Sequence, residues 1–236
     1  MPADDESDRE ALVRDQDRFL ETAFAYCEAL VREHDKDRFL AGMFAPAADR
    51  RRLFALYAFN IEIGRVRAAV REPMAGAIRL QWWREALLGE RPDEAAATPV
   101  AAALGAALAE TGTDPEPLVG AIELRRAELF GEPLTSVEPN IFLAAARLLG
   151  ADAQVLHAAA EDAGLAYDWS RDPAHRDAAR QHYAKFRATV DELPAVALPA
   201  FLPAALVPLR LGNPQPPQWR RQLTLLHAAW LGFPRG

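Results

Sequence analysis

Apolar residues recur every three to four positions along most of this chain, which is the spacing of amphipathic α-helices. The pattern predicts a first helix from Asp15, after a charged leader over residues 1–14. A short helix over residues 37–44 and a long one from Pro46 to about Arg71 follow, since proline is common in the first turn of a helix. The long helix is apolar on most sides, so we expect it to be central in the fold.

The rest of the chain continues the helical pattern. Pro73 and Gly76 are expected to interrupt it before a helix over residues 78–88, and residues 89–98 are expected to form a loop rich in charge and proline. Further helices are predicted over residues 99–110, 115–130, 136–149, 151–169 and 174–192, and around 219–230. The segment 193–208 holds four prolines and is expected to form kinked helices. The sequence therefore predicts an all-α fold.

Composition narrows this to one soluble domain over residues 15–236. At 236 residues the chain can bury a large core, and half of its residues are apolar. A net charge of −7 argues against nucleic-acid binding, and the lone Cys27 excludes an internal disulfide. The acidic start has no signal-peptide pattern. We expect a cytoplasmic protein, at most in peripheral contact with the inner membrane surface, although no basic face is evident from the sequence.

Two stretches of the sequence resemble the opening of the squalene/phytoene synthases. The first contains Asp37-Arg38-Phe39-Leu40, Met43-Phe44-Ala45-Pro46 and Arg51-Arg52-Leu53-Phe54-Ala55-Leu56-Tyr57-Ala58-Phe59-Asn60. The second is Ile78-Arg79-Leu80-Gln81-Trp82-Trp83-Arg84. A weaker resemblance continues in Ala163-Gly164-Leu165-Ala166-Tyr167 and in Leu198-Pro199-Ala200-Phe201-Leu202-Pro203-Ala204. It covers about residues 36–210 and is densest in the first third.

This resemblance implies a single-domain helical bundle of the isoprenoid-synthase kind, built around a central apolar cavity that holds two prenyl chains. In such enzymes, aspartate-rich motifs on two facing helices bind Mg²⁺, which in turn holds the substrate diphosphate. Ionisation of an allylic diphosphate places negative charge on the leaving group, and divalent cations stabilise that charge. Mg²⁺ needs hard oxygen ligands, so the carboxylates are essential to this chemistry.

The first aspartate-rich motif is missing from this sequence. Counted without gaps, its positions are Gly64-Arg65-Val66-Arg67-Ala68, with no carboxylate and two guanidinium groups. A unit positive charge about 4 Å from an arginine is repelled by roughly 4 kcal/mol at an effective dielectric of 20. We therefore predict no metal site and no resident cofactor here.

The second motif is also altered, because the chain passes from Tyr167 through Asp168 and Asp172 to Pro173 as if a segment were deleted. This implies a bundle shortened in its C-terminal third. Asp168 and Asp172 are four residues apart, which on a helix would place both carboxylates on one face. With 34 acidic residues in the chain, about five such pairs arise by chance, so the pair is a weak candidate for a ligand site.

The candidate cavity or anion-binding residues come from the stretches that carry the resemblance. They are Tyr57, Asn60, Glu62, Gly64, Arg65, Arg67, Gln81, Trp82, Trp83 and Tyr167. Each also has a simpler interpretation. Arg65 and Arg67 either bind a phosphate group or form ion pairs, and one tryptophan of the adjacent pair is expected in the core with the other at an interface. A metal site at His175 and His182 is a remote alternative.

Two functional hypotheses remain, beside the alternative of a purely structural helical protein with a filled interior. The first is a non-catalytic member of the family, closest to the branch that includes the respiratory complex I assembly factors. It would bind an isoprenoid, a lipid or a partner protein in respiratory-complex assembly, and it would not bind nucleic acid. The second is an active prenyl-diphosphate transferase of the phytoene or squalene synthase type, with an altered Mg²⁺ site that uses Arg65, Arg67, Asp168 and Asp172.

Overall fold

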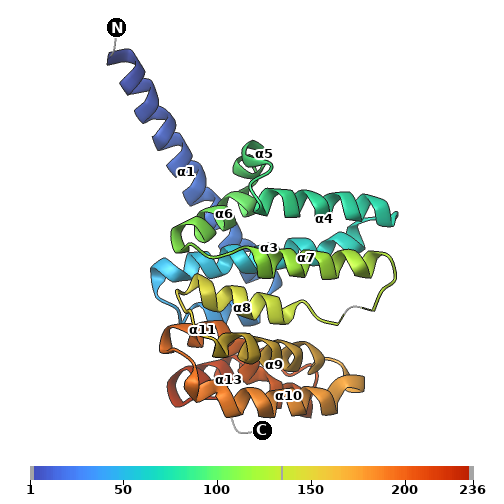
Figure 1. Cartoon of the computed structure of the whole chain (residues 1–236). Helices are drawn as coiled ribbons and strands as arrows, with labels where there is room; N and C mark the ends of the chain where they lie inside the picture. Colours follow the sequence, from blue (N-terminus) through green and yellow to red (C-terminus); the bar gives the residue numbers. More distant parts are fainter. Residues whose placement is uncertain (1–2, 134, 234–236) are drawn as a thin grey trace.

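The computed structural model describes residues 3–133 and 135–233, with side chains described from Arg14 onward. No β-strand occurs within these ranges, so the all-α prediction is confirmed. The helices lie across the molecule in layers (Figure 1). The upper layers hold α4 (Pro73–Leu87) and α6 (Pro99–Thr111), and the lowest hold α10 (Arg176–Thr189) and α13 (Gln218–Leu231). The N-terminal half of α1 (Ala3–His34) projects away from this body.

The helix α3 (Ala47–Ala69) is the central element, as its sequence predicts. It packs against α1, α4 (Pro73–Leu87), α6 (Pro99–Thr111), α7 (Glu116–Leu129) and α8 (Glu138–Leu148). Its residues Leu53 to Phe59 are all buried. A helix with apolar residues on every side can satisfy them only where neighbours surround it. The short α2 (Lys36–Gly42) joins α1 to α3.

The C-terminal part forms a second set of layers below α8. Helix α9 (Val155–Trp169) packs between α8 and α10 (Arg176–Thr189). The proline-rich segment forms short helical turns, as predicted: Ala195–Ala197, α11 (Leu198–Phe201), Leu202–Leu206 and α12 (Val207–Gly212). Helix α13 (Gln218–Leu231) packs against the turn at Leu202–Leu206 and against α2.

Several predicted boundaries are wrong. The first helix begins at Ala3 and not at Asp15, although residues 1 and 2 of the predicted leader lie outside the described part of the chain. Pro73 does not interrupt the chain before residue 78, because it occupies the first turn of α4. Gly76 lies inside that helix, where a Cβ atom would come within 2.8 Å of Leu129 on α7. The predicted loop contains the short α5 (Pro92–Ala97).

By length and composition, one stretch of the described chain could cross a membrane, namely Ala195–Gly212. Prolines break this stretch into the short turns described above, and 56% of it is buried inside the body. Its apolar side chains therefore serve the protein core. Phe201 of this stretch contacts Phe142 of α8 and Phe186 of α10, with ring centroids 5.8 and 5.7 Å apart.

Candidate functional site

The inner side of α3 carries polar groups into the protein interior. Tyr57 and Asn60 lie about one turn apart, and Gly64 follows one turn later. Among the described residues, the Tyr57 hydroxyl and Asn60 Oδ1 are buried without a hydrogen-bond partner. Gly64 faces α7, where the Arg125 guanidinium lies 3.7 Å from the position of a Cβ atom. Buried polar atoms are usually satisfied by protein or water, so these two atoms are candidates for contact with a water molecule or a ligand.

Arg65 and Arg67 are both exposed. Arg67 lies seven positions after Asn60, so helical spacing places it on the same side of α3 as Asn60 and Gly64. Arg65 lies 3.8 Å from Glu62, one turn earlier on the same helix. This geometry matches the ion-pair alternative for Arg65. An exposed pair of this kind contributes little to stability.

The adjacent tryptophans on α4 differ in their surroundings. Trp83 is buried, with its ring 5.3 Å from that of Phe59 in an edge-on contact. Trp82 is half-buried and donates a hydrogen bond to Glu94 of α5 at 2.8 Å. Gln81 donates to Glu85 at 2.9 Å, and this bond together with one from Arg91 lowers the pKa of Glu85. These contacts attach α5 to α4.

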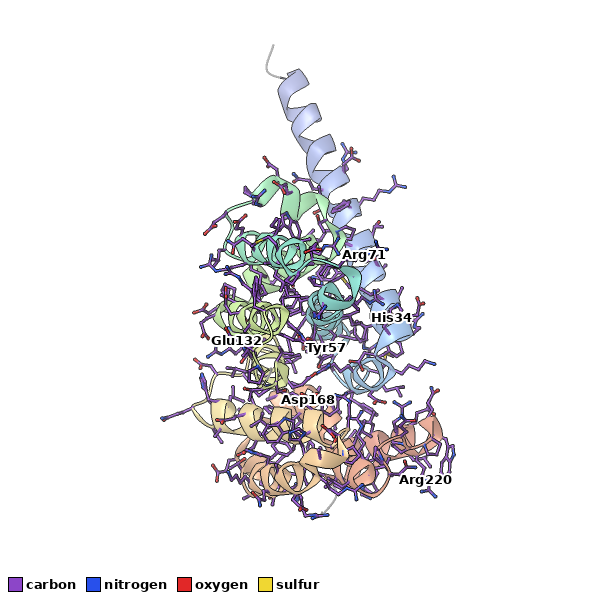
Figure 2. All side chains as sticks on the ribbon, turned by 90° about the vertical axis from the view of Figure 1, so that its right-hand side faces the viewer. His34, Tyr57, Arg71, Glu132, Asp168 and Arg220 are labelled. Carbon is purple, nitrogen blue, oxygen red and sulfur yellow. The ribbon has the colours of Figure 1, made fainter. Side chains whose placement is uncertain are left out.

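Tyr167, near the C-terminal end of α9, lies at the centre of an arginine cluster that the sequence analysis did not predict. The guanidinium carbons of Arg171, Arg210 and Arg38 lie 4.1, 4.4 and 5.3 Å from the centre of its ring. Arg38 is also 5.3 Å from the ring of Tyr57, so it lies between the two tyrosines. The Tyr167 hydroxyl is buried and has no hydrogen-bond partner within the described chain. Figure 2 shows Tyr57 inside the bundle, above Asp168.

Carboxylates bind the arginines of this cluster. Arg38 contacts Glu138 of α8 and lies 3.1 Å from Asp35, which caps α2. Burial by itself would lower the pKa of Arg38, but Glu138 and Asp35 raise it well above its ordinary value. Asp37 accepts from Arg210 and from Arg221, each at 2.7 Å. The acidic groups of this cluster are therefore already neutralised by arginine.

Solvent reaches the cluster through a pocket of about 490 Å³. Its polar lining comes from both ends of the sequence, and includes His34, Asp35, Lys36, Asp37, Arg171, Arg210 and Arg221. The cationic groups outnumber the carboxylates at this opening. The arrangement can therefore attract an anion without the help of a metal ion.

The predicted acidic pair does not share a helical face. Helix α9 ends at Trp169, so Asp168 lies in its last turn while Asp172 lies beyond it. Asp168 is 3.6 Å from Arg171. Asp172 accepts from the backbone N–H of Ala174 at 2.9 Å and from His175 at 2.9 Å, and these bonds lower its pKa. The i, i+4 geometry expected from the spacing was wrong, because Pro173 starts a separate turn.

The two histidines near this turn have separate partners. His182 contacts Asp162 at 2.7 Å, whereas His175 contacts Asp172. Their rings lie 5.3 and 5.6 Å from that of Trp169. Among the side chains described, those of residues 14–133 and 135–233, no group of three His, Cys, Asp or Glu is placed to hold a metal ion. This part of the chain is a packed junction of α9 and α10.

Only some residues of the arginine cluster around Tyr167 could be found from the sequence. Asp37 and Arg38 belong to the stretch that carries the family resemblance, and Arg171 follows Tyr167 closely. Glu138 and Arg210 could not be found this way, because they lie 100 and 173 positions from their partners Arg38 and Asp37. Only the packing of α2, α8 and α12 brings them together.

Comparison with solved structures identifies the fold. A dehydrosqualene synthase, solved in complex with ligand, superposes with a TM-score of 0.70 over 90% of this chain and 97% of that chain. The sequences are 15% identical over this alignment, so the likeness shows the fold alone. The predicted isoprenoid-synthase-like helical fold is confirmed.

Curated relatives match shorter stretches of this sequence. "NADH dehydrogenase (ubiquinone) complex I, assembly factor 6" of Homo sapiens is 38% identical over 60 residues, which cover 25% of this chain and 18% of that protein. The Mus musculus protein is 30% identical over 113 residues, covering 48% of this chain and 34% of that one. The alignments thus span about a third or less of these relatives. The squalene/phytoene synthase family model matches residues 31–168, which include α3, Trp82, Trp83 and Tyr167, and the chain belongs to the squalene/phytoene synthase family.

Proposed function

We propose that this chain is a non-catalytic member of its family that acts as a binding or assembly factor. The proposal is carried by the residues at the first aspartate-rich motif of the resemblance, Gly64 to Ala68. They include two arginines and no carboxylate. Gly64 stands on the inner side of α3 beside Arg125, and Arg65 and Arg67 occupy the neighbouring positions of the missing motif. Nothing in this segment supplies the oxygen ligands that Mg²⁺ requires.

The carboxylates that remain nearby are poor substitutes. Asp35 and Glu138 are bound by Arg38, and Asp37 is bound by Arg210 and Arg221. A magnesium ion would have to displace these buried arginines and would then lie close to their charge. Removing one partner from a buried ion pair costs about 3–5 kcal/mol, which opposes such an exchange.

The names of the curated relatives support the assembly part of the proposal. We infer that the chain contributes to the assembly of a respiratory NADH dehydrogenase by binding a partner protein, and that its interior binds an isoprenoid or another lipid. The polar groups of Tyr57, Asn60 and Tyr167, buried without partners in the described chain, give that ligand a set of hydrogen-bonding groups.

The decisive experiment for the non-catalytic part is a turnover assay. Purified protein is incubated with farnesyl or geranylgeranyl diphosphate and Mg²⁺, with a dehydrosqualene synthase as positive control, and diphosphate release is measured. We expect none above the protein-free background. Mg²⁺-dependent release that yields a coupled prenyl product would overturn the proposal and favour an altered transferase.

The assembly role needs a separate test. The gene is deleted in the source organism, and the amount of fully assembled NADH dehydrogenase is measured on native gels. We expect a loss that the wild-type chain restores. Unchanged assembly in the deletion strain would contradict the assembly role and leave the turnover result unaffected.

A further inference from the structure

The charge of this chain is strongly divided along the sequence. Residues 173–236 contain eight Arg or Lys against three Asp or Glu, a net charge of +5. Residues 1–172 contain nineteen against thirty-one, a net charge of −12. From residue 193 onward the chain has no acidic residue at all. Of these cations, Arg210 and Arg221 bind Asp37 and Arg180 binds Asp177. The surface of α10 and α13 keeps the positive side chains Arg176, Lys185, Arg187 and Arg220.

Helix α13 presents an apolar stripe to solvent. Trp219, Leu223, Leu226 and Trp230 follow at spacings of four, three and four residues, so they share one side of the helix. Their exposed fractions are 56, 57, 47 and 78%. The opposite side is anchored by the buried Leu225 and Ala228 and by Arg221, which binds Asp37. The stripe is thus not the packing face of the helix.

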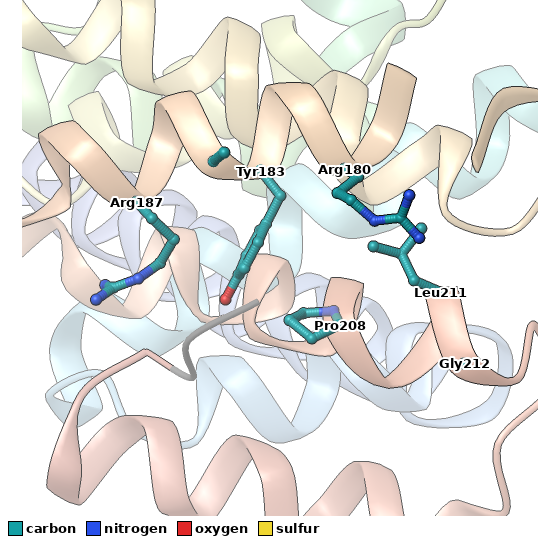
Figure 3. Close-up of a pocket in the computed structure, with 7 residues that line it drawn as sticks. Arg180, Tyr183, Arg187, Pro208, Leu211 and Gly212 are labelled. Atoms are coloured by element: carbon teal, nitrogen blue, oxygen red, sulfur yellow. The ribbon is translucent and has the colours of Figure 1, made fainter. Parts of the chain in front are cut away.

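Two adjacent pockets continue this surface toward α10. One, of about 900 Å³, is lined by Trp230, Leu231 and Phe233 together with Leu193, Arg187 and Asp191. The other, of about 730 Å³, lies between α10 and α12 and also has Arg187 in its lining. In Figure 3, Arg180 and Arg187 extend on either side of Tyr183, above Pro208 of α12. Arg180 also binds Asp177, at 2.8 Å.

We propose that the face formed by α13 and the neighbouring ends of α10 and α12 docks on an anionic phospholipid bilayer. Exposed tryptophan and leucine on one side of a helix enter the interface between headgroups and acyl chains, and tryptophan is favoured at that depth. The positive charge of residues 173–236 complements anionic headgroups. Arg187 lies between the two pockets, where a guanidinium can bind a lipid phosphate beside apolar walls.

The charge of α13 favours a bilayer over a second copy of the chain as the partner of this face. In a dimer through the stripe, Arg220 would have no carboxylate on the facing helix, because residues 193–236 contain none. Figure 2 shows Arg220 at the outer edge of the lower layers. The bilayer supplies the negative charge that another α13 lacks. This proposal is independent of whether the protein transfers prenyl groups.

The test is co-sedimentation of the full chain with lipid vesicles. One set is phosphatidylcholine alone, and the other is equal parts phosphatidylcholine and phosphatidylglycerol. We expect binding to the anionic set that weakens with added salt, since salt screens the headgroup charge. Leu223→Glu should weaken that binding by about tenfold or more, because it places a charge where the bilayer would bury an apolar side chain. Arg187→Gln should reduce the preference for the anionic set.

The matched control is Ile78→Glu, which makes the same change at an exposed residue of α4 far from this face. Ile78 is 66% exposed, against 57% for Leu223, and the two variants should have equal melting temperatures. Retained binding by Ile78→Glu with lost binding by Leu223→Glu supports the proposal. No sedimentation with anionic vesicles would overturn it. So would a wild-type dimer that Leu223→Glu converts to monomer without any effect on vesicle binding.

Discussion

At the scale of single residues, Arg38 connects the most distant parts of the site. It joins the start of the bundle, through Asp35, to Glu138 of α8, and it lies over the rings of both Tyr57 and Tyr167. A buried charge held in this way is costly to leave unpaired. We expect Arg38→Met to lower the free energy of unfolding by about 3–5 kcal/mol, since Glu138 then stays buried without its cation.

Urea unfolding followed by circular dichroism measures this change. Arg180→Met is the matched control, because its partner Asp177 is exposed and such a pair is worth less than about 1 kcal/mol. The double variant Arg38→Met, Glu138→Leu should recover part of the loss, since it removes both charges. Equal, small effects of Arg38→Met and Arg180→Met would contradict the structural role given to Arg38.

Cys27 gives a pH-dependent prediction at the same scale. Burial raises the pKa of its thiol from an ordinary value of 9.0 to about 12. Below pH 9 the thiol is neutral in both folded and unfolded states, and its contribution to stability is fully present. As the pH rises from 9 toward 12, only the unfolded state ionises, so that contribution is lost.

Stability of the wild type should therefore fall more steeply above pH 9 than that of Cys27→Ala, by at most about 1.4 kcal/mol per pH unit. Urea midpoints measured in a pH series give the two slopes. Tyr57 and Tyr183, whose pKa values are also raised by burial, affect both proteins equally and cancel in the comparison. Identical slopes for the wild type and Cys27→Ala would mean that folding does not raise the pKa of the thiol.

At the scale of helices, α8 and α9 approach closely at a glycine. A Cβ atom on Gly164 would lie 2.4 Å from the backbone nitrogen of Pro139, and backbone cannot move aside as a flexible side chain can. Gly164→Ala should destabilise the protein by about 1–3 kcal/mol, measured by thermal or urea unfolding. Gly105 in α6 has no such neighbour within 4 Å, so Gly105→Ala should stabilise by about 0.4–1 kcal/mol. The same sign for both variants would refute this contact.

Helix identity could be predicted from the sequence because apolar periodicity depends only on neighbouring positions. The residues at which helices start were harder to predict, as Pro73 shows. Proline ends one helix or occupies the first turn of the next, and the sequence alone did not separate these cases. For the site, Tyr57, Asn60 and Tyr167 could be found from local motifs. Glu138 and Arg210 could not, because their role exists only after distant segments pack.

The sequence shows an excess of Arg and Lys over residues 173–236, but not which of these side chains are exposed. The exposed cations lie on α10 and α13 and form no single basic run. Arg65 and Arg67 were the more obvious candidates for an anion, yet both are exposed to solvent. The interior arginines Arg38 and Arg210 replaced them, since only those are drawn inside by buried carboxylates.

At the scale of the whole molecule, the upper and lower layers share one apolar interior. The main cluster of buried residues runs from Ala23 on α1 to Val207 on α12, and a smaller cluster joins α2 to α13 through Leu206 and Leu225. Phe233 packs against both clusters. A shared apolar interior favours cooperative unfolding. The single-domain organisation predicted for residues 15–236 therefore has a direct test.

We expect one cooperative unfolding transition in urea, with coincident midpoints by far-ultraviolet circular dichroism and by tryptophan fluorescence. The tryptophans sample both parts, since Trp83 lies in the upper layers and Trp169 in the lower ones. Replacing the exposed Trp219 and Trp230 with phenylalanine leaves only reporters from the body, and the midpoint should not move. Two separated midpoints would instead divide the chain near α8, and the arginine cluster around Tyr167 would then lie at a boundary between domains. A shared core makes that division costly, because exposing either half would uncover the aromatic contacts of Phe142 with Tyr167 and Phe201.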